Sequence, residues 1–178
     1  MEDPRLAAEL VERMDRDQEA RAAVGAHPSD ESALARVRAV DEENTAWLRA
    51  VVERSGWPHR SAVGAEAAGA AWLLAQHADQ DPEFQRRCRS LLDHAVRAGE
   101  ADPAHLAYLT DRVRRAAGEP QLYGTQFWHG PDGRGPLVVQ PVEDPARLDE
   151  RRRAVGLGPF AEYEEAMRRQ DADPPTPD

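Results

Sequence analysis

The stretch that decides the fold is residues 65–78, AEAAGAAWLLAQHA, which is apolar on nearly every side when wound into a helix. A helix without a polar face has no side that suits water, so other helices must surround it. The sequence therefore predicts a helical bundle with residues 65–78 at its centre. The longest apolar run, residues 67–75, is far shorter than the ~20 residues that a membrane span needs. We expect no membrane partner.

Helices are predicted on both sides of this central segment. Asp3 and either Ser29 or Asp30 are the expected N-caps, because their side chains accept hydrogen bonds from the first turn of a helix. Gly56 is suited to a left-handed C-terminal cap. The predicted helices cover residues 4–24, 31–55, 82–98 and 103–117. With the central helix, these make a bundle of about five main helices.

The residue types and their pattern change after residue 120. Residues 121–128 are rich in aromatic and β-favouring side chains, and a Gly/Pro turn separates them from residues 137–139, which predicts a small β-hairpin. Two short helices are expected over residues 145–155 and 160–170. The length fits a single helical domain over residues 1–170, and the Pro/Asp-rich residues 171–178 predict a disordered tail.

Composition excludes several partners. The chain has 178 residues and a formal net charge of −10, which disfavours nucleic acid because phosphates need a basic surface. The single cysteine, Cys88, shares helical spacing with Phe84 and Leu92, so we interpret it as a core thiol. An acidic, helical N-terminus differs from a signal peptide. We expect a bacterial, cytoplasmic protein with a small-molecule substrate; the sequence does not indicate an oligomeric state.

Two polar residues interrupt an apolar stripe on the predicted helix 31–55. Positions 34, 37, 41, 44, 48 and 51 share one face, and four of them are Leu or Val. Asp41 and Asn44 occupy the middle two. A buried carboxylate and amide need hydrogen-bond partners. They either tie this helix to a neighbour or line a ligand pocket, and the spacing leaves both interpretations open.

His77 ends the apolar helix, where its ring can project from the rim of the core and exchange a proton near neutral pH. The alternative is a capping histidine that bonds the last carbonyls of its own helix. His77, Asp79 and Asp81 alternate as metal ligands sometimes do, but there is no second histidine one turn away and no cysteine pair. We expect no metal and no cofactor.

Neutral hydrogen-bonding side chains alternate along the first arm of the hairpin. Gln121, Tyr123 and Thr125 can hold a carbonyl or enolate oxygen, or the arm can simply pack over the helices with Tyr123 half-buried. Asp111 and Arg112 lie off the apolar stripe of their helix, and spacing alone indicates a surface ion pair.

Several segments resemble a family of small bacterial proteins catalogued as a domain of unknown function. The most specific are His77-Ala78-Asp79, Asp111-Arg112 and the run Tyr-Gly-Thr-Gln at residues 123–126; weaker matches include Gly56-Trp57-Pro58. The resemblance covers residues 35–165 and implies a helical fold with a polar cluster. Its motifs mark seven residues as candidates, which are His77, Asp79, Asp111, Arg112, Gln121, Tyr123 and Gln126. Asp111 and Arg112 gain a functional interpretation from it that spacing does not give.

Together these observations favour a cofactor-independent acid–base enzyme, of the lyase, isomerase or cyclase type, acting on a small organic molecule. The predicted catalytic residues are His77, Asp79, Asp111 and Tyr123, with His77 oriented by Asp79 or Asp111. The predicted substrate-binding residues are Asp41, Asn44, Trp57, Arg112, Gln121 and Gln126. Two alternatives stay open: a non-catalytic helical ligand-binding or regulatory module, and a metal-dependent hydrolase.

Overall fold

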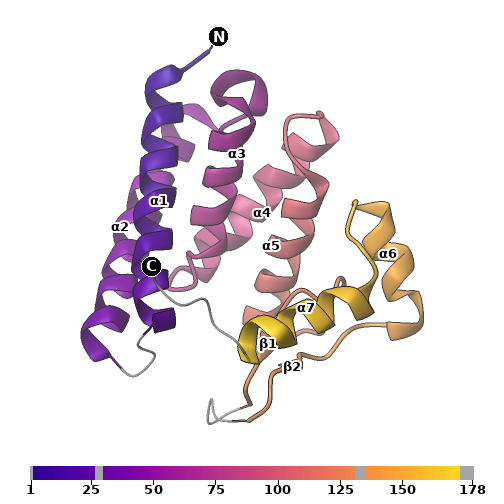
Figure 1. The fold of residues 1–178 in the computed structure, drawn as a ribbon. Coiled ribbons are helices and arrows are strands. Elements are labelled where there is room, and N and C mark those ends of the chain that lie inside the picture. Colours follow the sequence, from indigo (N-terminus) through magenta and orange to yellow (C-terminus); the bar gives the residue numbers. More distant parts are fainter. Residues whose placement is uncertain (1, 27–29, 131–134, 173–178) are drawn as a thin grey trace. The chain divides into compact units, whose positions relative to one another are not determined.

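The structure is a computed structural model that describes residues 2–26, 30–130 and 135–172 (Figure 1). It is 72% helical with a small two-stranded sheet, so the predicted mainly α fold is confirmed. The chain divides into two compact units, Met1–Asp102 and Pro103–Pro175, which we call the first and the second unit. The predicted disordered tail falls mostly on residues 173–178, which lie outside the described residues.

The first unit contains four helices, α1 (Pro4–Ala26), α2 (Glu31–Ser55), α3 (Arg60–Gln76) and α4 (Pro82–Arg97). The expected N-caps are confirmed, since Asp3 accepts from the N–H of Leu6 and Asp30 from that of Ser32. Gly56 ends α2 with φ 78° and ψ −168°. The positive φ suits glycine, but the predicted left-handed helical cap is wrong because ψ is extended. Side chains of α1 and α2 pair along their length, and α1 and α3 lie side by side (Figure 1).

The apolar helix α3 is central to the first unit, as its composition predicts. It contacts α1, α2 and α4, and Ala70, Ala71, Leu74 and Ala75 are almost fully buried. Its small side chains let the neighbouring helices approach closely. The thiol of Cys88 on α4 is buried as well, and burial raises its pKa to about 12.

The predicted start of the central helix, residue 65, is five residues late. A helical turn already begins at Arg60, where the N–H groups of Ala62 and Val63 bond the carbonyl of His59. Gly64 then interrupts the helix with φ 85° and ψ 166°. Because glycine favours turns, the sequence pattern does not predict a helical turn before Gly64.

The second unit contains α5 (Pro103–Ala116), β1 (Phe127–Trp128), β2 (Val138–Val139), a 3-10 helix (Pro145–Arg147), α6 (Leu148–Ala154) and α7 (Phe160–Ala172). The hairpin is confirmed, with Phe127 opposite Val139 and Trp128 opposite Val138 in an antiparallel pair. Its first strand is shorter than predicted. Residues 122–126 are irregular, because their backbone bonds a side chain of α5 described below.

No helix among the described residues is both long and apolar enough to cross a membrane.

Candidate functional site

A cluster of four charged or titratable side chains lies where α1, α2 and the end of α3 meet. Asp17 and Arg21 stand one helical turn apart on α1, so they share a face. Asp41 projects from α2, and His77 is the first residue after α3. Residues from three segments therefore converge at one place, which we call the His77 cluster.

The hydrogen bonds of the cluster favour one tautomer of the neutral imidazole. His77 Nδ1 lies 2.9 Å from Asp17 Oδ1 and 3.1 Å from Arg21 Nε. Arg21 Nε also donates to Asp17 Oδ2 at 3.2 Å, so its hydrogen has an acceptor without His77. A proton on Nδ1, donated to Asp17, satisfies all three groups at once. The lone pair of the neutral ring is then on Nε2, as in enzymes where a carboxylate orients a basic histidine.

The pKa values of the two carboxyl groups of the cluster are shifted in opposite directions. Asp17 is only 1% exposed; burial alone would raise its pKa, but His77 and Arg21 together outweigh burial and lower it. Burial raises the pKa of Asp41, even though Arg21 Nη2 donates to its Oδ1 at 2.5 Å. Carboxyl pairs whose environments drive their pKa values apart are typical of acid–base sites.

The same residues offer a set of metal-ligating atoms. One atom each from Asp17, Asp41 and His77 lies within 4.8 Å of the others, and imidazole with two carboxylates suits several divalent ions. Arg21 bonds both carboxylates, however, and already supplies the positive charge that they need. A metal ion would have to displace this guanidinium.

The other site residues predicted in the first unit make contacts outside the His77 cluster. Asn44 is 3% exposed and accepts from Arg13 Nη1 at 3.2 Å, so both polar residues of the α2 stripe bond to α1. Asp79 accepts from Gln85 Nε2 at 3.2 Å in the turn before α4. Trp57 is buried and lines a separate cavity of about 440 Å³ beside the start of α1.

Asp111 is the centre of a second polar network, in the second unit. Its carboxylate is fully buried and accepts the backbone N–H groups of Leu122, Tyr123 and Thr125 and the hydroxyl of Thr125. Burial raises the pKa of Asp111, and these hydrogen bonds offset only part of that rise. The network folds residues 122–125 around one side chain, which supports a structural role for Asp111.

The remaining predicted residues of the second unit join this network. Gln121 accepts the N–H of Gln126 and donates to the carbonyl of Gln126, and Arg112 Nη1 donates to Gln126 Oε1 at 3.2 Å. Tyr123 is half-buried, as one interpretation of the sequence expected; burial raises the pKa of its phenol. Its carbonyl accepts from Arg152, a buried residue on α6.

A model described as Family of unknown function (DUF6624) matches residues 4–172. The chain belongs to this family. No curated protein and no solved structure matched it. The DUF6624 match includes the residues of both networks, so the resemblance seen in the motifs is confirmed at the level of the family.

The structure of this DUF6624 chain groups the predicted residues within each unit. His77 and Asp41 come together in the first unit, and Asp111, Gln121, Tyr123 and Gln126 in the second. Sequence reasoning missed Asp17 and Arg21, which complete the His77 cluster. A signal for Asp17 existed, because it interrupts the apolar stripe of Leu10, Met14 and Val24 on α1 as Asp41 interrupts that of α2.

Proposed function

We propose that the chain is a cofactor-independent acid–base enzyme acting on a small organic molecule, with His77 as the proton-transferring residue. The observation that carries the proposal is the hydrogen bond from His77 Nδ1 to the buried Asp17. It holds the ring in one orientation and one tautomer and leaves Nε2 as the base. The His77 side chain is 14% exposed, so part of the ring is open to solvent.

Arg21 is suited to stabilise negative charge during the reaction. Its Nε and Nη2 groups bond Asp17 and Asp41, while Nη1 has no hydrogen bond within the described part of the chain. The side chain is 31% exposed. A guanidinium held by two carboxylates is rigid, and its remaining N–H groups can bind the oxygen of an enolate as charge develops there.

These roles define a class of reaction. His77 Nε2 removes a proton from the carbon next to a carbonyl, and the electron pair of the C–H bond forms an enolate bound by Arg21. The imidazolium then returns the proton, either to a departing hydroxyl, which leaves as water, or to another carbon of the substrate. Dehydration, isomerisation and ring closure by conjugate addition all follow this scheme, and we place it in bacterial cytoplasmic secondary metabolism.

The residues predicted in the second unit carry no step of this scheme. Gln121 and Gln126 bond each other, and Asp111 holds the backbone of residues 122–125. Asp17 takes the orienting role that was predicted for Asp79 or Asp111, and the roles predicted for Asp79 and Tyr123 stay predictions. The metal-dependent hydrolase is the second candidate, favoured by the mutual distances of Asp17, Asp41 and His77.

Proton exchange tests the proposal without knowledge of the natural substrate. A panel of β-hydroxy ketones and thioesters in D₂O is followed by NMR for loss of the α-proton signal. His77→Gln should lower the exchange rate by about 10²–10⁴-fold, the usual contribution of one positioned acid–base group. His94→Gln is the matched control, since His94 is exposed on α4. Exchange that survives in His77→Gln rejects the assignment of His77.

A further inference from the structure

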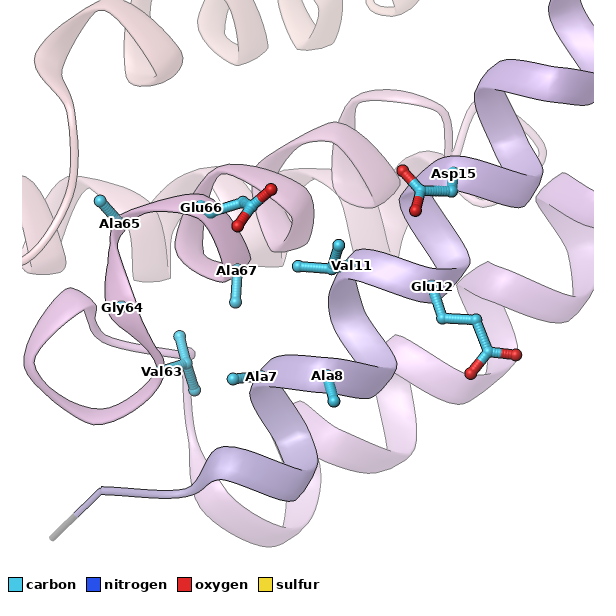
Figure 2. A pocket seen from close by; sticks show the side chains of 10 residues that line it. All are labelled: Ala7, Ala8, Val11, Glu12, Asp15, Val63, Gly64, Ala65, Glu66 and Ala67. Atoms are coloured by element: carbon cyan, nitrogen blue, oxygen red, sulfur yellow. The ribbon is translucent and has the colours of Figure 1, made fainter.

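An open groove lies between the first half of α1 and the start of α3, away from the residues of the His77 cluster. Its volume is about 700 Å³, within the range of small-molecule sites. Figure 2 shows Val63 and Ala67 of α3 facing Ala7 and Val11 of α1 across this space. The groove therefore has an apolar floor built from two helices.

The break in α3 creates the room. Gly64 takes a φ of 85° with a ψ of 166°, which only glycine adopts at low cost. The turn before it and the helix after it therefore do not form one continuous cylinder. Ala7, Ala8 and Ala67 carry only a methyl group, so the side chains of a close helix pair do not fill the space that the break leaves.

The edge of the groove is acidic. Glu66 of α3 and Asp15 of α1 place carboxylates at its border (Figure 2), and both residues are exposed. Neither forms an ion pair with any cation of the described residues. Glu12, the third acid, lies near Arg16. No basic residue lines the groove, and residues 1–102 carry 20 acidic against 13 basic side chains.

We infer that this groove binds an amphipathic amine: a small ligand with an apolar body and one protonated nitrogen. The apolar part lies against Ala7, Ala8 and Val11, which keep exposed surface, and the ammonium group lies between Glu66 and Asp15. An anionic ligand of the same size is repelled by both carboxylates, and a neutral one gains only the apolar contact. The inference concerns binding and does not depend on the proposed proton transfer.

The test titrates the full chain with three probes of similar size, 2-phenylethylamine, 2-phenylethanol and 3-phenylpropionate, followed by ¹H–¹⁵N NMR. For an amine of nine non-hydrogen atoms we expect a Kd of about 1 mM. The amide signals of Val11, Val63, Gly64 and Ala67 should shift. The alcohol should bind about fivefold more weakly, because two partly solvated ion pairs add a modest term, and the carboxylate more weakly still. Salt at about 0.5 M should reduce the difference between amine and alcohol.

Variants separate the two halves of the site. Asp15→Asn and Glu66→Gln should each weaken the amine about two- to threefold and leave the alcohol unchanged, since an exposed ion pair contributes little. Glu42→Gln, an exposed acid on α2, is the matched control and should change neither. Ala7→Leu fills the floor and should abolish binding of both. Equal affinity for amine and alcohol overturns the inference. So does binding that all the variants retain, or no binding of the amine at about 10 mM.

Discussion

Replacing Asp111 with Asn changes one atom of a buried network and should lower the stability of that network far more than the small change in size suggests. Asp111 Oδ1 accepts from Leu122 at 2.7 Å, and Oδ2 accepts the N–H of Thr125 at 3.0 Å and its hydroxyl at 2.9 Å. In the amide, one of these oxygens becomes an NH₂ group that faces an N–H donor. A buried donor left without an acceptor costs about 1–3 kcal/mol, and each bond to a charged acceptor that becomes neutral loses about 1 kcal/mol.

We therefore expect Asp111→Asn to destabilise residues 122–125 by about 3 kcal/mol. Amide hydrogen exchange measured by NMR reads this directly: exchange at Leu122, Tyr123 and Thr125 should become about 100-fold faster, since 1.4 kcal/mol is a factor of ten. Thr125→Val removes the hydroxyl bond to Asp111 and the bond that this hydroxyl accepts from Gln126 Nε2, but keeps the backbone N–H bonds to Asp111. It should speed exchange about fivefold. Glu162→Gln, an exposed acid on α7, is the control. Unchanged protection in Asp111→Asn, with activity lost, would refute the structural role and restore Asp111 as a catalytic residue.

Three further predictions concern other parts of the chain. The folded-state pKa of Asp17 lies below its ordinary value of 3.8, so the folded chain binds fewer protons than the unfolded chain in that window and stability rises with pH there. Urea unfolding should therefore show that Asp17→Asn is less stable than the parent chain, with the full difference near pH 6 and a smaller one below about pH 4. A difference that grows as the pH falls would contradict a lowered pKa of Asp17. Calorimetry should show that Arg21→Ala binds Zn²⁺ at least about tenfold more tightly than the parent chain, because removal of the competing guanidinium is worth more than about 1.4 kcal/mol. Stoichiometric metal in the purified parent chain would instead support the hydrolase. Gly124→Ala should lower the melting temperature more than Gly118→Ala: both glycines have positive φ, but only at Gly124 does an added Cβ meet Phe160 Cε2, at 3.0 Å.

The helical part of the fold was predictable because its signals are local. Helix α2 begins at Glu31, after Asp30, and ends at Ser55, before Gly56, as predicted. These ends were predictable because capping depends on neighbours within one turn. Asp41 was recognisable as unusual for the same reason, because the other residues of its stripe, apart from Asn44, are Leu and Val. Local signals could not say which partner it would find.

The His77 cluster required information that spacing does not contain. Asp17 and His77 are 60 residues apart, and their meeting depends on how α1 and α3 are rotated and shifted against each other. The prediction of a strand over residues 121–126 failed for a related reason. Alternation from Gln121 to Gln126 predicts a strand, but the Asp111 carboxylate offers the same backbone N–H groups a charged acceptor, and side chains of this kind compete with sheet formation.

The break at Gly64 also bears on how the beginning of α1 is held. The short turn that precedes it carries the carbonyl of Ala62, which accepts the N–H of Asp3 at 2.8 Å and so anchors the beginning of α1. Whatever widens or narrows the space beside Gly64 pulls on this anchor. A fluorophore attached at the N-terminal end of the chain would then act as an optical sensor of the groove, since its mobility should change when the groove is filled.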